Sequence, residues 1–544
     1  MAFLLLLTQL SASVVFRLRT RESEFAMEIQ SAKFARFSAA SKKRVALLAS
    51  LLLCGCWSGL GAQETPPATQ DVPIIRSSTR LVVLDVVVSD AHGRPVHDLS
   101  AQDFHVLEDG VEQKIASFES PSRAGAHNSG APAGGVTPGR SGGNAIPSRN
   151  ILVLDELNTE VLDEAYSRQS IDKYLRKHGP TLEQPTSLLI VGQDHLEFAH
   201  DYTRDAGALR LALHGHHSAL PFEKDTGGDY NAVDRFSKSL WVLKQIASAN
   251  LHYAGRKNVI WIGAGFEEFT GRTLAYQDKK KFMDVIREMA DVLFEARIAI
   301  YTINPEGLQV SPTEGIGSFG DLMNSELVFE GLALQTGGKI IRGRNELDGA
   351  IAETIEDGAS YYTMSYSPVN RDWNGEFRNI SVTANGTKLQ VRARKGYYAL
   401  AESPLSPLEV DDRVSQALMS PLPFRALDVQ AAVTSAESGT GKYILNVNPN
   451  GLEWKKLDSG KWRCQVTAVT ATMGAGTQFA THNVRELEAI LDAQQYKKAF
   501  SKPVAFNLVA ELPSDTRFVK VVVRDSSNGN IGTAEIQRGE IRAR

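Results

Sequence analysis

Three histidines lie close together in the sequence and could suggest a metal site. They are His214, His216 and His217. Zinc sites in proteins use characteristic Cys and His spacings, or two histidines on a helix with a glutamate beside them. Neither pattern occurs near these histidines, so we expect them to lie in a solvated loop.

The motifs of the common enzyme classes do not occur in this sequence. Gly263-Ala264-Gly265 follows a predicted strand, but it lacks the third glycine of a dinucleotide-binding loop. We find no Gly-x-Ser-x-Gly elbow, no His-Glu-x-x-His, no P-loop and no recognisable Cys–His signature. With no nucleophile or general base in view, we expect a protein that is not an enzyme.

Two further groups of polar and aromatic residues have structural interpretations. Arg256 and Lys257 follow Gly255, which is typical of a solvated turn after a helix. Five tyrosines are expected to pack in a β-core rather than to bind a ligand. They are Tyr361, Tyr362, Tyr366, Tyr397 and Tyr398.

Short apolar runs alternate with helical patterns in the middle of the chain. The runs are residues 151–154, 187–191, 259–262 and 298–303. Between them, apolar residues recur every three or four positions, which indicates amphipathic helices. Because parallel strands need crossover connections, this alternation predicts an α/β fold with a doubly wound, mainly parallel sheet.

Strand patterns flank this α/β region on both sides. β-Branched runs and Asp-Gly or Asn-Gly turns predict strands before and after it, and an all-β sandwich at the C-terminus. The expected organisation is a small β-unit (76–120), a Gly/Pro/Ser linker (121–149), the α/β domain (150–358), β-segments that pair with 76–120 (359–400), a connector (401–424) and the β-sandwich (425–544).

The N-terminal 62 residues have the features of an export leader. Lys42-Lys43-Arg44 precedes the apolar run 45–53, which is too short to span a bilayer. Cys56 follows a small residue, as the lipidated cysteine of a bacterial lipobox does, but ordinary cleavage after Ala62 is also consistent with the sequence. Residues 63–75 would then form a tether. We expect a periplasmic, outer-membrane-anchored or extracellular protein.

Charge is distributed unevenly along the chain. The whole sequence has a formal net charge of −4, but the first 62 residues hold eight Lys or Arg and three Asp or Glu, which leaves 51 basic and 60 acidic residues, a net −9, in the rest. An acidic body argues against nucleic acid as a partner. Only Cys464 remains if the chain is cleaved after Ala62, so no intramolecular disulfide is expected.

A set of motifs in a fixed order carries a family resemblance. Between about Thr79 and Ala399 the sequence resembles bacterial VWFA-related domain proteins, which are abundant in acidobacteria. The matching segments are 103–110, 155–159, 255–261, 301–308, 336–338, 361–368 and 394–398. The resemblance implies a von Willebrand factor A-type fold with a metal-ion-dependent adhesion site at the carboxyl edge of its sheet.

In such a site, oxygen ligands from three loops hold Mg²⁺ while a carboxylate of the partner completes the coordination sphere. The family pattern implies Asp155 and Thr159 in the first loop, Thr203 or Thr226 in the second, and an acidic residue in the third. Here Leu157 replaces one serine and Ala264 the usual aspartate, so Glu267 or Glu268 would have to supply the third loop.

Two interpretations of this degenerate site remain open. Asp155, Asn158 and Thr159 could cap the following helix, whereas the loop geometry of the family's metal site would have Asn158 face elsewhere. Alternatively, Asp155, Thr159, Thr226 and Glu267 could hold Mg²⁺ or Ca²⁺. We accordingly expect either a recognition protein that binds a protein partner without metal, or a divalent-metal-dependent adhesin or accessory subunit of an envelope complex.

Overall fold

The computed structural model describes residues 80–121, 147–193, 195–217, 229–265, 276–306, 329–386, 388–401, 406–474 and 479–541. The predicted leader (1–62), the tether (63–75), most of the linker (121–149), Thr226, Glu267 and Glu268 lie outside the described residues. Within the described part, no helix is long and apolar enough to cross a membrane.

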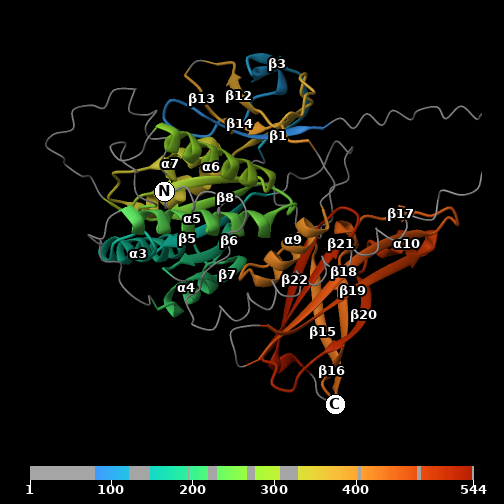
Figure 1. The fold of residues 1–544 in the computed structure, drawn as a ribbon. Coiled ribbons are helices and arrows are strands. Elements are labelled where there is room, and N and C mark those ends of the chain that lie inside the picture. The colour runs from blue at the N-terminus through green and yellow to red at the C-terminus, as the bar shows by residue number, and fades with distance from the viewer. Residues whose placement is uncertain are drawn as a thin grey trace, which may run out of the picture. The chain divides into compact units, whose positions relative to one another are not determined.

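A six-stranded sheet forms the centre of the fold (Figure 1). Its order is β10 (Ile340–Ile341), β9 (Ile298–Ile303), β8 (Lys257–Ile262), β5 (Arg149–Asp155), β6 (Thr181–Val191) and β7 (Leu196–Asp205). All neighbouring strands are parallel except β6 and β7. The prediction of an α/β fold with a mainly parallel sheet is therefore confirmed.

The antiparallel edge strand β7 was not predicted from the sequence. Most of its residues are only partly buried, because the strand lies at the edge of the sheet, and its apolar pattern is correspondingly weak. Thr203, a candidate ligand in the second loop, lies in this strand, where it pairs with Thr186. Its assignment to a site loop was wrong.

Helices cover both faces of the sheet. Side chains of β5 alternate between the two faces: Ile151 and Val153 belong to one core, and Leu152 and Leu154 to the other. The first core includes residues of α5 (Asp229–Asn250), α6 (Tyr276–Glu295) and α7 (Phe329–Gln335), and the second includes residues of α3 (Val161–Lys177), α4 (Ala206–Gly215) and α8 (Leu347–Ala359).

The strand order reverses between β5 and β8. The chain leaves β5 towards β6 and β7, and then returns to the other side of β5 to form β8 and β9. The connections that follow β5 and β8 therefore separate at the carboxyl edge, which is where doubly wound sheets bind ligands.

Segments on either side of the central domain form one β-unit, which we call the split β-module. Its first part contains β1 (Val82–Ser89), the short helix η1 (Ala101–Asp103), β2 (Phe104–Glu108), β3 (Val111–Gln113) and β4 (Ile115–Glu119). Its second part contains β11 (Tyr362–Tyr366), β12 (Phe377–Ala384), β13 (Gln390–Arg392) and β14 (Gly396–Tyr398). They form two four-stranded sheets, β13-β1-β11-β4 and β14-β12-β2-β3, so each sheet combines both parts of the chain.

Three of the five tyrosines, Tyr362, Tyr366 and Tyr397, pack in the core of this module, whereas Tyr361 and Tyr398 are half-buried. Two of the buried tyrosines also bind a buried charge. The hydroxyls of Tyr366 and Tyr397 both donate to Glu108, which also pairs with Arg378 at 3.0 Å. A buried carboxylate needs such donors because burial disfavours its charge.

After the helix α9 (Pro407–Met419), the chain forms a C-terminal β-region of two antiparallel sheets. One sheet contains β15 (Val429–Glu437), β16 (Thr440–Val447) and β20 (Val504–Glu511). The other contains β17 (Lys455–Lys456), β18 (Trp462–Met473), β19 (Phe479–Leu491), β21 (Phe518–Asp525) and β22 (Ile531–Gln537). Residues of both sheets share one core, which includes the free thiol of Cys464. The remaining elements are η3 (Pro449–Gly451), α10 (Ala493–Ala499) and η4 (Arg538–Glu540).

Candidate functional site

Asp155 lies at the carboxyl end of β5 and is completely buried. Its Oδ1 accepts hydrogen bonds from the backbone N (3.0 Å) and Nδ2 (3.1 Å) of Asn158, and its Oδ2 accepts from Asn158 Nδ2 (2.9 Å) and Trp261 Nε1 (2.8 Å). Burial raises the pKa of Asp155, and the Asn158 and Trp261 donors offset this only in part. The carboxylate is thus enclosed by neutral N–H groups.

The loops after β5 and β8 close on each other at this point. Thr159 Oγ1 accepts a hydrogen bond from the backbone N of Ala264 at 3.1 Å. Gly263 has a φ of +154°, and a Cβ there would lie 2.5 Å from both Asp155 Cβ and Thr159 Oγ1. Glycine is therefore required for the two loops to approach so closely.

The capping interpretation of this loop was wrong. Helix α3 begins at Val161, and its N-cap is Glu160, which forms no side-chain cap bond. Asn158 also does not face away: it contacts Asp155 and donates to Ser239 Oγ at 3.2 Å. These polar side chains form hydrogen bonds within the loop and to β8, and they do not cap the helix.

The described donors do not fit a divalent cation at Asp155. Such an ion needs several oxygen ligands, but both Asp155 oxygens face N–H groups, and Leu157 is buried in the core. Among the residues that the structure describes, no group of three or more His, Cys, Asp or Glu could hold a metal. One buried acceptor here, Asn158 Oδ1, has no partner, but a single neutral oxygen is not a coordination sphere.

A second polar network at the same edge centres on His216. Its side chain is buried between two carboxylates, with Nε2 2.9 Å from Glu156 Oε1 and Nδ1 2.5 Å from Glu197 Oε2. Arg168 also pairs with Glu156, at 2.8 Å. Burial raises the pKa of Glu156, and its neighbours His216 and Arg168 offset this only in part. The solvated-loop prediction was wrong for His216, although His214 and His217 are exposed.

No local signal in the sequence indicated this network. Glu156 and Glu197 lie 60 and 19 residues from His216, and they meet it only because β5 and β7 belong to the same sheet. The only part of the network that the sequence spacing indicates is the pair of Glu164 and Arg168, which lie four residues apart on α3 and form an ion pair at 2.8 Å.

Two apolar side chains are exposed at the same edge of the sheet. Val161 and Leu162 open α3 directly after the Asp155 loop, and their exposed fractions are 41% and 84%. Exposed leucines are common singly. Two such residues beside a loop at the topological switch point give this edge an apolar contact surface.

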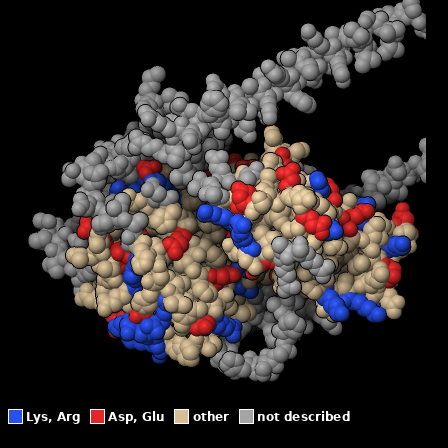
Figure 2. All heavy atoms as spheres, turned by 90° about the horizontal axis from the view of Figure 1, so that it is seen from below, with Lys and Arg blue, Asp and Glu red and all other residues tan. Residues whose placement is uncertain are grey.

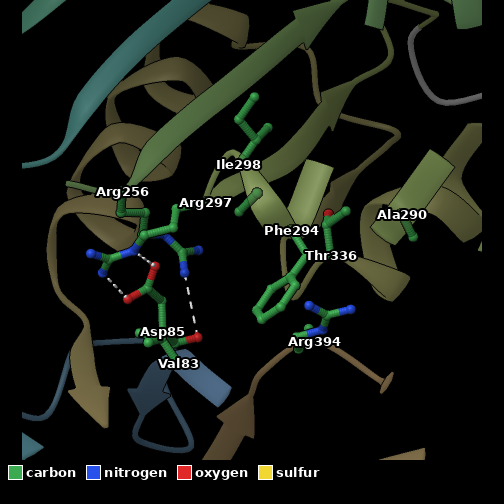
Figure 3. A pocket seen from close by; sticks show the side chains of 10 residues that line it. Val83, Asp85, Arg256, Ala290, Phe294, Arg297, Ile298, Thr336 and Arg394 are labelled. Atoms are coloured by element: carbon green, nitrogen blue, oxygen red, sulfur yellow. Dashed lines mark hydrogen bonds and ion pairs between the residues drawn. The ribbon is translucent and has the colours of Figure 1, made fainter. Parts of the chain in front are cut away.

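The opposite, amino edge of the sheet carries buried cations. Arg256 and Lys257 are 2% and 1% exposed, so the prediction of a solvated turn was wrong. Arg256 donates to Tyr301 Oη (3.2 Å), and Arg297 pairs with Asp85 of the split β-module at 2.5 Å. Figure 3 shows Asp85, Arg256 and Arg297 among the residues that line a cavity of about 30 Å³. The volume suits a single water molecule, not a substrate.

Comparisons with known proteins give little further information. No family model and no curated protein matches the chain. A solved structure of the SpRpn10 VWA domain matches 38% of this chain and 94% of its own length, with 16% identity and a TM-score of 0.21. At so low a TM-score, the match by itself assigns neither a family nor a function.

Proposed function

We propose that this chain is an exported recognition protein, not an enzyme, which binds a protein partner at the carboxyl edge of a von Willebrand A-type domain without a metal ion at Asp155. The C-terminal β-region would serve as an accompanying β-sandwich. The observation that carries the proposal is the enclosure of the Asp155 carboxylate by Asn158 and Trp261, which leaves it no free oxygen with which to bind a cation or a substrate.

Features around Asp155 support recognition by contact. Val161 and Leu162 expose apolar surface beside a loop that Gly263 and Thr159 hold in place. A preorganised loop with an apolar contact loses little conformational entropy on binding. Figure 2 shows basic and acidic side chains interspersed on the face that it draws. This mixture agrees with a protein partner rather than nucleic acid, which would favour a basic face.

The experiment is affinity capture from the envelope of the source cell with the full chain as bait. We expect a defined partner that is retained by wild type, lost with Leu162→Asp, and retained with Val369→Asp. Val369 is a matched control because it is also an exposed apolar residue (66%) but lies in the split β-module. Equal retention by both variants would place the contact elsewhere and contradict the proposal.

Metal dependence separates this proposal from the alternative of a divalent-metal-dependent adhesin. We expect Mg²⁺ and Ca²⁺ to produce no binding heat with wild type and to leave its melting temperature unchanged, and a chelator to leave partner capture intact. Binding heat that disappears with Asp155→Ala would support the adhesin instead, with Thr226 and Glu267 as the further ligands.

A further inference from the structure

A basic and aromatic surface occurs at one end of the C-terminal β-region. The strand β17, the start of β18 and the helix α10 lie side by side there (Figure 1). Trp462 and Tyr496 stack in parallel, with ring centroids 4.1 Å apart and an interplanar angle of 6°. Trp454 and Phe500 contact Tyr496 edge-on, at 5.7 and 5.1 Å. We call this end the β17–α10 tip.

Lysines surround the aromatic cluster of the tip. All of them are exposed, and none forms an ion pair with a carboxylate of the described residues. They are Lys455, Lys456, Lys461, Lys497, Lys498 and Lys502. The half-buried Arg463 adds a seventh basic group, against Glu453, Asp458, Glu488 and Asp492 as the acidic residues nearby. A net positive tip on a chain with a net charge of −4 favours an anionic ligand.

The acidic residues of the tip reduce this field only in part. The Asp492 carboxylate accepts hydrogen bonds from the backbone N of Gln494 and Gln495, so it is engaged at the start of α10. Asp458 lies in the turn between β17 and β18, where Leu457 and Lys461 are hydrogen-bonded through their backbones.

Apolar side chains are exposed among the lysines. Phe500 is 43% exposed directly after α10, and Ile490, near the end of β19, is 46% exposed. Ile490 pairs with Arg463, and Arg463 pairs with Lys455, so these three residues form one row across neighbouring strands. The tip therefore combines exposed cations with exposed apolar groups.

The chemistry of the tip distinguishes between anionic ligands. Six of its seven basic groups are lysines, which act as point charges rather than as the planar fork that pairs with a single carboxylate. Trp462 and Tyr496 stack on each other, so the two ring faces that meet are not available for stacking with a base or a sugar. Lysine, tryptophan, tyrosine and exposed phenylalanine together are typical of proteins that rest at a lipid–water interface.

We propose that the β17–α10 tip binds the surface of an anionic phospholipid bilayer. The lysines contact the phosphates of the headgroups, and Phe500 enters the boundary between headgroups and acyl chains. This inference concerns a surface on a different part of the chain from the Asp155 edge, and it does not depend on the function proposed above.

The test is co-sedimentation of the full chain with vesicles of phosphatidylcholine and phosphatidylglycerol, compared with vesicles of phosphatidylcholine alone. We expect binding only to the anionic vesicles, and weaker binding as the salt concentration rises. Removing one lysine is expected to lower the partition coefficient about fivefold. Equal binding to both vesicle types would overturn the proposal.

Variants assign the binding to the tip rather than to another segment. Lys497→Gln with Lys498→Gln should weaken binding more than twentyfold, by roughly two such factors, and adding Phe500→Ser should weaken it further. Lys442→Gln, at an exposed lysine of β16 outside the tip, should leave binding unchanged. An unchanged melting temperature would show that each variant folds.

A polymeric anion is the competing ligand for a basic surface. Single-stranded DNA and heparin are titrated against the same variants. If they bind in a manner that depends on Lys497 and Lys498 while anionic vesicles do not bind, the proposal of a bilayer is overturned.

Discussion

An aspartate lies at each of the two edges of the central sheet, but the pKa of its carboxyl group is shifted in opposite directions at the two edges. At the amino edge, Asp85 belongs to the split β-module and its side chain is 10% exposed. Burial acts to raise the pKa of Asp85, but the guanidinium groups of Arg297 and Arg256 outweigh it, and the pKa is lowered. At the carboxyl edge, Asp155 meets only neutral donors, and its pKa is raised.

The difference separates an edge that is fastened to the split β-module from an edge at which two loops of the sheet are held together. Arg297 and Asp85 come from different parts of the fold, so their ion pair ties the split β-module to the central domain. The enclosure of Asp155 instead ties together two loops of the same sheet edge, which remains available for contact through Leu162. At the amino edge, paired charges fasten the central domain to the split β-module. At the carboxyl edge, hydrogen bonds hold the loops in place, and no other module of the described chain covers them.

The largest expected effect comes from breaking the ion pair at the amino edge. Arg297→Met should lower the free energy of unfolding by about 3 kcal/mol, because it removes the ion-pair partner of the Asp85 carboxylate and leaves only Arg256 as a nearby cation. Arg344→Met removes the exposed pair with Glu353 and should cost less than about 1 kcal/mol. Urea denaturation measures both. Similar losses for the two variants would show that the Asp85 pair is not special.

Asp155→Ala should lower the free energy of unfolding by about 2 kcal/mol. It leaves the Trp261 and Asn158 N–H groups without an acceptor in a buried place. Asp155→Asn should cost about half of this, because the new amide keeps one oxygen that can accept from these donors. Thermal and urea unfolding compare the two. If the alanine variant is as stable as wild type, the enclosure does not hold the loops together.

The burial of Lys257 predicts that the free energy of unfolding changes with pH at neutral to alkaline pH. Burial, together with the charges of Arg297 and Arg149, lowers its pKa from 10.5 to about 7. Between these values the folded chain binds fewer protons than the unfolded chain, so stability should rise with pH, by about 1 kcal/mol over one pH unit. Lys257→Met should remove this rise. The same slope in the variant and in wild type would contradict the assignment.

The smallest expected effect is a pair of opposite slopes at acidic pH. The raised pKa of Asp155 means that its contribution to stability is present below its ordinary pKa of 3.8 and is lost as the pH rises through the folded value. The lowered pKa of Asp85 gives a contribution that is present above 3.8 and is lost as the pH falls through the folded value. Asp155→Asn and Asp85→Asn should each remove one slope. Slopes of the same sign would refute the contrast between the edges.

The sequence predicted the parts of the fold in which each segment carries its own pattern. Strands β5, β8 and β9 are continuous apolar runs, because both of their faces are covered by helices. The edge strand β7 is mostly half-buried, so it lacked both a continuous apolar run and a clear alternation. It was missed for that reason.

The polar sites were not predictable because their partners are distant in sequence. Trp261 was visible only as an apolar residue of a strand, yet its indole N–H reaches Asp155 across 106 positions. Arg256 contacts the backbone of Asp85 across 171 positions. A basic residue after a glycine is usually exposed, and only the folded split β-module makes this one buried. Asp155 itself could be placed at the end of its strand, but its donors could not.

The split β-module brings the two ends of its chain segment together, since Arg80 donates a hydrogen bond to the backbone oxygen of Leu400 at 2.6 Å. Between these residues the chain forms the whole central domain. The antiparallel pair of β1 and β11 therefore closes this segment, so separating its two ends would first require that strand pair to open. After Leu400 the chain also packs directly on the central domain, through Leu422 and Phe424. The loops around Asp155 lie at the opposite edge of the central sheet, so the hydrogen bonds that close them do not involve this strand pair.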